Sequence, residues 1–180
     1  IHDVPKNQRF FTGMDNYIHC VESLNGSYLN AFSKAYGEKA QEMCLKAFLD
    51  TDTWTEQCDE DLMMASWMGG MSIAYSQVGA AHALSYGMAV VYGVRHGEGC
   101  CIAFNQLADI YPEGVANFHK MLDKWQIDLP SGVCKNATEE QMNLVIKVSS
   151  GMVPLWENCL GKDWQKIVTP ERMRELYSKM

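Results

Sequence analysis

Apolar residues recur at steps of three and four along most of this chain, which places their side chains on one face of an α-helix. The clearest apolar face lies in residues 38–49 and consists of Ala40, Met43, Cys44, Ala47 and Phe48. No window alternates between apolar and polar residues as a half-buried strand does, and no glycine-rich strand-to-helix turn occurs. The pattern predicts an all-α protein that folds as a single domain over residues 1–180.

Capping and breaking residues divide this pattern into separate helices. After an extended leading segment over residues 1–10, in which His2 is a solvated terminal residue, the expected helices span about 12–24, 28–36, 38–49, 62–75, 77–91, 100–111, 115–125, 138–148 and 155–160, with a last one beginning at 169–171. Gly37 is expected to separate the second helix from the third. Residues 62–75 are apolar nearly all round and rich in methionine, which predicts burial on several sides in preference to an adaptable binding surface.

Composition excludes several classes of protein. A net charge of -7 argues against a nucleic-acid surface, and no run approaches the roughly twenty apolar residues of a membrane span. The seven cysteines are odd in number and show no two-residue spacing, which favours a reducing cytoplasm over a disulfide framework. Ile1 in place of a methionine predicts a trimmed, cleaved or partial chain.

Three histidines and one aspartate occur in settings that favour a metal site. Asp15 and His19 are four residues apart, so both project from one helix face. His82 lies among small residues that let a bound group approach, and His96 follows fourteen positions later in an Arg-His-Gly-Glu-Gly turn. Three imidazoles and a carboxylate suit iron(II) or zinc better than magnesium or calcium. Isolated histidines on helices usually pack against neighbours or form capping hydrogen bonds and bind no ligand. We expect His119 to be such a surface or capping histidine.

Longer stretches around these residues resemble the iron-containing (group III) alcohol dehydrogenases of the dehydroquinate-synthase-like superfamily. They are Thr-Gly-Met-Asp15-x-x-x-His19, a histidine in a small-residue helix, His96-Gly, Leu62-Met-Met-Ala-Ser-Trp-Met-Gly-Gly-Met and the end segment Thr169-Pro-Glu-Arg-Met-Arg-Glu-Leu-Tyr. The resemblance covers nearly the whole chain. It implies the helical bundle of that fold's C-terminal, metal-binding domain, and it implies that the N-terminal α/β domain, which binds the nucleotide, is absent from this sequence.

The resemblance also implies an activity and a ligand set. Asp15, His19, His82 and His96 would hold one divalent ion, iron(II) or zinc, with one coordination position left exchangeable. The ion would polarise the oxygen of a primary alcohol while hydride passes to NAD(P), so that the alcohol becomes an aldehyde. NAD(P) would be bound through the missing N-terminal domain.

Two residues depart from the family pattern. Tyr86 stands where many members carry a second histidine, four residues after His82, and it either relays a proton or packs over the pocket. Arg95 stands where a proline is common, and it either pairs with a substrate carboxylate or forms a surface ion pair with Glu98.

Within the family, these departures fit a resemblance to the 3-deoxy-manno-octulosonate 8-oxidases. Those enzymes oxidise the terminal hydroxyl of an eight-carbon sugar acid, ahead of an aminotransferase, in bacterial lipopolysaccharide assembly. The resemblance therefore predicts a sugar-acid substrate, a bacterial source and a downstream aminotransferase as partner.

Three alternatives stay open, together with the oligomeric state. The first is a dehydroquinate-synthase-like lyase or cyclase, which the Asp15–His19 pair argues against because such sites typically include a glutamate. The second is a nonhaem iron oxygenase with two histidines and one carboxylate, which a fourth protein ligand disfavours. The third is a non-catalytic helical interaction module with structural histidines. An exposed methionine-rich face would suit a homodimer.

Overall fold

The computed structural model describes residues 3–180, so His2 lies outside the described residues. This range contains no strand, and its α-helices are α1 (Lys6–Leu24), α2 (Ala31–Leu45), α3 (Glu56–Tyr75), α4 (Ala80–Tyr92), α5 (His96–Phe104), α6 (Pro112–Trp125), α7 (Glu139–Ser150), α8 (Val153–Leu160) and α9 (Pro170–Ser178). A π-helical turn (Lys46–Asp50) follows α2, and a 3-10 turn (Trp164–Lys166) precedes α9. The all-α prediction is confirmed.

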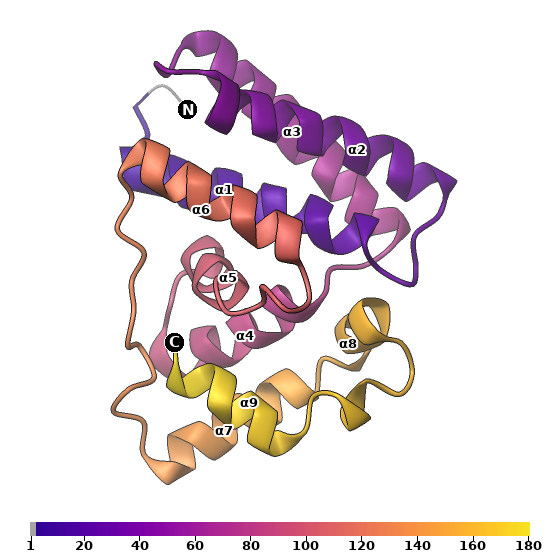
Figure 1. Ribbon diagram of the computed structural model, residues 1–180, viewed down its shortest axis with the longest axis vertical. Helices are drawn as coiled ribbons and strands as arrows, with labels where there is room; N and C mark the ends of the chain where they lie inside the picture. The colour runs from indigo at the N-terminus through magenta and orange to yellow at the C-terminus, as the bar shows by residue number, and fades with distance from the viewer. Residues whose placement is uncertain (1–2) are drawn as a thin grey trace.

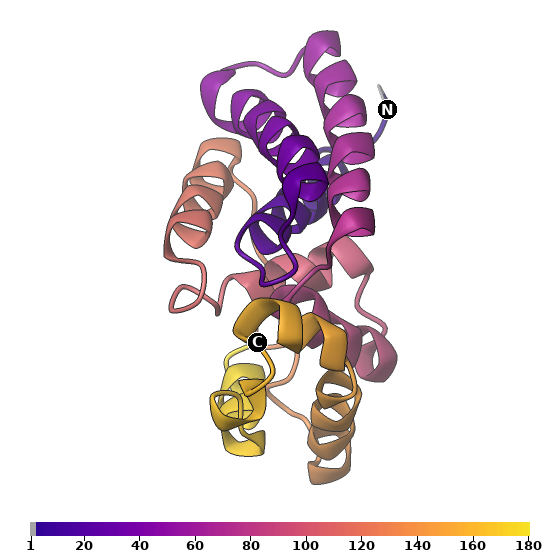
Figure 2. The same cartoon turned by 90° about the vertical axis from the view of Figure 1, so that its right-hand side faces the viewer.

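The helices form two groups joined by a central pair. α1, α2 and α3 lie together at one end of the molecule, α7, α8 and α9 lie at the other, and α4 and α5 lie between them (Figures 1 and 2). α1 packs against α2, α3 and α5, while α4 packs against α5 and α7. α1 and the central pair therefore meet in the middle of the fold, where the predicted ligands lie.

The first helix begins six residues earlier than we predicted. α1 begins at Lys6 after the N-cap residue Pro5, so most of the segment expected to be extended is helical. Its apolar face already starts at Phe10, which is buried with Met14 in the core. Thr12 does not cap the helix; its hydroxyl accepts a hydrogen bond of 2.9 Å from the Gln8 side chain.

The two helices expected on either side of Gly37 are one continuous helix, α2. Its start is fixed by Asn30, whose side chain accepts hydrogen bonds from the backbone in a capping box with Ser33. A Cβ atom added to Gly37 would lie 2.7 Å from the hydroxyl of Ser72 on α3. The glycine thus permits close packing of α2 on α3, and that contact outweighs its low helix propensity.

The starts of four other helices also differ from the prediction. Pro112 begins α6 at its first position, where we expected a stop. α5 begins at His96, four residues before the expected start, and α4 begins at Ala80 after Gly79. α3 begins at Glu56 because the Thr55 side chain caps it, six residues before the expected start at 62.

The helices expected to begin near residues 138 and 169 do begin there, each behind a capping threonine. Thr138 forms a capping box with Gln141 at the start of α7, and the Thr169 hydroxyl accepts a hydrogen bond from the backbone N–H of Arg172 at the start of α9. All seven cysteines are free thiols, as expected. None of the helices in residues 3–180 has the length and apolar character required to span a membrane.

The expected burial of α3 on several sides is wrong. Met63 is 62% exposed and Trp67 is 56% exposed, and Phe32 on the neighbouring α2 is 64% exposed. Aromatic rings continue along this face, because Tyr75 stacks on both Phe32 and Tyr36 with ring centroids 5.1 and 6.1 Å apart. A helix without a polar face carries no sequence signal that distinguishes its buried side from its exposed side.

Candidate metal centre

The predicted ligands come from three helices, α1, α4 and α5. α1 supplies Asp15 and His19, α4 supplies His82 in its first turn, and α5 supplies His96 as its first residue. Gly97 lets the start of α5 approach α1 closely, because an added Cβ would lie 2.8 Å from the carbonyl oxygen of Phe11. Residues distant in the sequence are thereby brought to one place.

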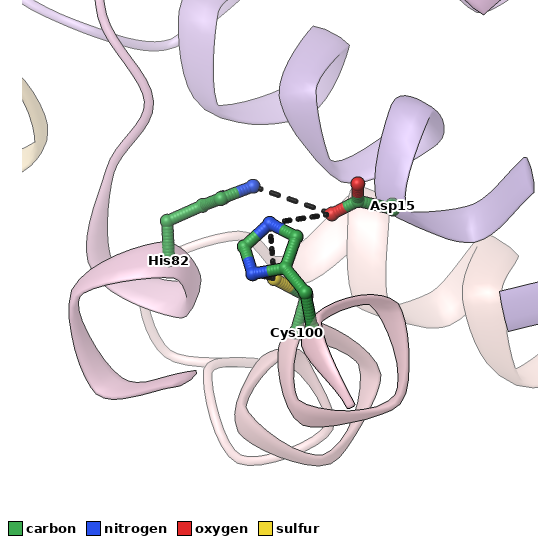
Figure 3. A group of neighbouring side chains, drawn as sticks. Asp15, His82 and Cys100 are labelled. Atoms are coloured by element: carbon green, nitrogen blue, oxygen red, sulfur yellow. Dashed lines mark hydrogen bonds and ion pairs between the residues drawn. The ribbon is translucent and has the colours of Figure 1, made fainter. Parts of the chain in front are cut away.

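Asp15, His82 and His96 converge on a common point. The Nε2 atoms of His82 and His96 lie 3.4 and 3.5 Å from the same oxygen, Oδ1 of Asp15. Figure 3 shows Asp15 and His82 pointing toward each other, with Cys100 close by. In residues 3–180, Asp15 Oδ1 and His82 Nε2 are among the few buried side-chain atoms that have no hydrogen-bond partner. Buried polar atoms nearly always have a hydrogen-bond partner, so two that face each other without one are typical of a cation-binding site.

The spacing of these atoms fits a metal ion. Ligand atoms that lie about 2.0–2.2 Å from one zinc ion are roughly 3.0–3.6 Å from each other. Both distances to Asp15 Oδ1 fall within this range. The chemistry of the set, carboxylate oxygen with imidazole nitrogen, also suits iron(II) or zinc. The residues present therefore fit a divalent ion.

His19 lies at the margin of this group. Its Nε2 atom is 3.8 Å from Asp15 Oδ2, the oxygen that does not face the other two histidines. Its ring stacks on the ring of His82, with centroids 4.8 Å apart and an interplanar angle of 27°. A ligand role for His19 stays a prediction.

Cys100 was not predicted at this site. Its thiol belongs with Asp15, His82 and His96 to a group of potential ligand atoms that lie within 4.8 Å of one another. Its sulfur is nearly equidistant from the two ring nitrogens of His96, at 3.8 and 4.0 Å, so it lies against the ring and not in the direction of a nitrogen lone pair. The thiol donates to the Ser85 hydroxyl at 3.4 Å. Its position four residues after His96 was the available signal.

Glu22 is the second residue that sequence reasoning missed. Its side chain is fully buried, and its Oε2 atom accepts a hydrogen bond of 2.5 Å from Nδ1 of His82. The same carboxylate accepts from the backbone N–H groups of Gly79 and Ala81, at 2.8 and 2.6 Å. Glu22 follows Asp15 by seven residues and therefore lies on the same face of α1, which is a signal that the sequence did contain.

The electrostatics of the group follow from burial and neighbouring charges. Burial opposes ionisation of Asp15, but His82 and the other two imidazoles outweigh it and lower the pKa of Asp15 to about 2. Burial, together with the nearby His82, lowers the pKa of His19 to about 4. Burial also opposes charge on His82, yet Glu22 and Asp15 raise the pKa of His82 well above its usual value. The site is therefore built to hold positive charge between two carboxylates.

Tyr86 and Arg95 lie beside this group and not within it. The ring of Tyr86 stacks on His96, with centroids 5.7 Å apart. Arg95 is exposed at the N-cap position of α5, and its Nη1 atom donates to the side-chain oxygen of Gln8 at 3.4 Å. The ion pair with Glu98 that we considered is not present among the described residues. Arg95 borders a hollow of about 630 Å³ that Asp15 also lines.

Known proteins resemble this chain in sequence. Residues 10–152 match the family model described as "Fe-containing alcohol dehydrogenase family, C-terminal". The chain is 28% identical over 111 residues to 4-hydroxybutyrate dehydrogenase of Clostridium kluyveri, covering 58% of this chain and 30% of that protein. It is 27% identical over 100 residues to alcohol dehydrogenase 4 of Schizosaccharomyces pombe, covering 54% of this chain and 24% of the relative.

Solved structures share the fold over 97% of the chain. The sulfoacetaldehyde reductase from Bifidobacterium kashiwanohense, solved in complex with NAD+, superposes with a TM-score of 0.77 at 18% identity, and 50% of its chain is covered. An iron-containing alcohol dehydrogenase from Thermotoga maritima superposes with a TM-score of 0.74 at 21% identity, and 49% of its chain is covered. The chain thus spans about half of these structures and less than a third of the curated relatives it matches.

Proposed function

We propose, from the premise that this chain belongs to the Fe-containing alcohol dehydrogenase family, that it is the metal-binding half of an NAD(P)-dependent alcohol dehydrogenase. The reaction proposed is oxidation of a primary alcohol to an aldehyde, or its reverse. The observation that carries the proposal is the pair of buried atoms Asp15 Oδ1 and His82 Nε2, which have no hydrogen-bond partner and face each other at 3.4 Å with His96 alongside.

We propose that Asp15, His19, His82 and His96 hold one divalent ion, iron(II) or zinc. Asp15 presents one oxygen to both His82 and His96, and His19 completes the set from the next turn of α1. The bound ion would supply Lewis-acid chemistry that makes an alcohol easier to deprotonate. Both metals accept these ligands, and which metal is loaded depends on availability as much as on affinity.

Other residues of this chain would orient the substrate and handle its proton. The ring of Tyr86 supports one face of His96, and its position at the edge of the group supports a role as proton relay. Arg95 and Asp15 border the same hollow, so a substrate whose hydroxyl lies near Asp15 can extend toward the guanidinium. NAD(P) would be bound by an α/β domain outside this chain, as the share of the relatives that the chain leaves uncovered supports.

We propose an alcohol with a carboxylate as substrate class, with the terminal hydroxyl of 3-deoxy-manno-octulosonate as the specific candidate. The exposed Arg95 beside the hollow supports it, because a guanidinium pairs with a carboxylate through two parallel hydrogen bonds. The similarity to a 4-hydroxybutyrate dehydrogenase supports the class, since that relative's named substrate is also an alcohol with a carboxylate. A bacterial source, a role in lipopolysaccharide assembly, a homodimer, an aminotransferase partner and a cytoplasmic location stay predictions.

Metal analysis and an activity assay together test this function. Zinc titrated into the metal-free chain is expected to bind at one site per chain, and the full-length protein containing this chain is expected to oxidise a primary alcohol only with NAD(P) and metal present. A chain that keeps its helical fold and binds no metal would instead support a helical interaction module. Oxygen consumption and product formation without nicotinamide would support an oxygenase.

A further inference from the structure

We propose that Glu22 is a positioning residue for the metal centre, which acts through His82, and that the same side chain caps α4. The inference rests on the proposed metal centre. The N-cap residue of helix α4 is Gly79, which has no side chain with which to cap the first backbone N–H groups. Glu22 on α1 takes that place, because its carboxylate accepts from the N–H groups of Gly79 and Ala81.

The same carboxylate fixes the imidazole of His82. Oε2 accepts from the Gly79 N–H at 2.8 Å and from Nδ1 of His82 at 2.5 Å, so the ring is held against the backbone of its own helix. A carboxylate accepts, so Nδ1 carries a proton, and an ion that replaces the second proton of the ring would meet the lone pair of Nε2. That Nε2 atom lies buried, without a hydrogen-bond partner, 3.4 Å from Asp15 Oδ1.

The local structure is arranged to admit this carboxylate. A Cβ atom on Gly79 would lie 3.3 Å from Glu22 Oε1 and 2.6 Å from the hydroxyl of Tyr111, so only glycine leaves room for both groups. The buried negative charge is offset by three donors at the positive end of α4. A cap alone would need only the two backbone donors, and the third contact goes to the ring whose other nitrogen faces the proposed ion.

Asp59 provides a matched comparison within the same chain. It is also a buried carboxylate, in the first turn of α3, and it accepts a hydrogen bond of 2.7 Å from the indole of Trp54. It also forms an ion pair of 3.3 Å with Arg9. No member of the proposed ligand set contacts Asp59, so its removal tests loss of a buried carboxylate without loss of support for a ligand.

Zinc affinity of a Glu22→Gln variant tests the role. The amide keeps the volume but has one acceptor oxygen in place of two, so it cannot accept from all three donors. Loss of a hydrogen bond to a metal-bound histidine typically weakens metal binding about 10–100-fold. We expect a loss of that size in competition titrations with a chromophoric chelator, together with an altered visible spectrum of the cobalt(II) form. Asp59→Asn should leave the zinc affinity and the cobalt spectrum unchanged.

The outcomes separate this role from the proposed function. A folded Glu22→Gln chain that binds zinc as tightly as the wild type overturns the positioning role and leaves the metal centre standing. A wild-type chain that binds no zinc overturns the metal centre and the role together. If the variant does not fold, ¹⁵N NMR of the zinc-loaded wild type decides. A protonated Nδ1 on His82 supports the role, and a protonated Nε2 or a zinc-bound Nδ1 overturns it.

Discussion

Two groups of buried polar side chains lie along α1, and they differ in how their hydrogen bonds are satisfied. Between α1, α2 and α3, the hydroxyls of Ser23 and Ser72 pair at 2.8 Å, and Ser72 also donates to the carbonyl of Ser33 at 2.8 Å. Beside α4 and α5, Asp15 Oδ1 and His82 Nε2 face each other without a hydrogen bond. The first group has its hydrogen-bond partners within the protein, whereas these two atoms of the second group have none.

This difference distinguishes a cluster that supports the fold from one for which we propose a binding role. A satisfied buried hydrogen bond contributes about 0.5–1.5 kcal/mol to stability, whereas an unsatisfied buried group costs about 1–3 kcal/mol. The serines therefore hold three helices in register. Asp15 and His82 meet as an ion pair whose facing atoms form no hydrogen bond, and a divalent cation between them would satisfy both atoms, so this arrangement favours a binding role.

The largest expected effect is loss of metal from a His82→Ala chain. This change removes Nε2 from the proposed ion, and we expect zinc affinity to fall by more than the roughly 100-fold that loss of an outer partner can cause. His119→Ala is the matched control, because His119 is exposed and its Nε2 atom pairs with the side chain of Asn105, away from the proposed ligands. Competition titration measures both variants, and unchanged zinc affinity in His82→Ala would remove this residue from the site.

Zinc should stabilise the wild-type chain against heat. At a free zinc concentration of 100 times Kd, binding adds about 2.7 kcal/mol to the free energy of unfolding, provided that the unfolded chain does not bind. Differential scanning calorimetry with and without zinc measures the shift in Tm. The His82→Ala chain should show no such shift, and an equal shift in both chains would place the zinc elsewhere.

Arg95→Ala should weaken binding of carboxylated alcohols only. A hydrogen bond to a charged group contributes about 1.5–3 kcal/mol, so KM for such substrates should rise roughly 10–100-fold in the full-length protein. Arg174→Ala serves as control, since Arg174 pairs with Glu139 on the surface. A KM that rises equally for neutral alcohols, or not at all, would argue against recognition of a carboxylate.

Ser72→Ala should lower the stability of the fold without changing metal affinity. The variant loses the hydrogen bonds to Ser23 and to the Ser33 carbonyl, so we expect about 1–3 kcal/mol less free energy of unfolding in urea denaturation. Zinc affinity should equal that of the wild type. Weaker zinc binding would show that the two polar groups are coupled and that the contrast between them does not hold.

Tyr86→Phe should have the smallest effect. It keeps the ring that stacks on His96 and removes only the hydroxyl, so metal content should not change. A positioned acid–base group contributes about 10²–10⁴-fold, and a relay acting through water should contribute less, so we expect turnover to fall by no more than about tenfold. Steady-state kinetics of the full-length protein measures this, and unchanged turnover would eliminate the relay.

The sequence could predict only part of the candidate site. The spacing of Asp15 and His19 and the small-residue settings of His82 and His96 nominated candidate ligands, and the family resemblance joined them into one set. That α4 would bring His82 to Asp15 depends on tertiary packing, which periodicity does not encode. Glu22 escaped notice for the same reason, since its partners are the backbone and ring of another helix.

Glycine and proline caused two of the boundary errors in the fold. Gly37 predicted a break but lies at a contact between α2 and α3, and Pro112 predicted a stop but begins α6. The exposed side of α3 could not be predicted either, because Met63 and Trp67 are as apolar as the residues on its buried side. Local propensity determined which segments are helical, and packing determined where they end.

Anomalous diffraction from crystals of the zinc-loaded chain tests the central claim most directly. The account predicts one strong peak about 2.0–2.2 Å from Asp15 Oδ1, His82 Nε2 and His96 Nε2, with His19 as the remaining protein ligand. A peak bound elsewhere on the chain, or no peak between Asp15 and His82, would contradict it.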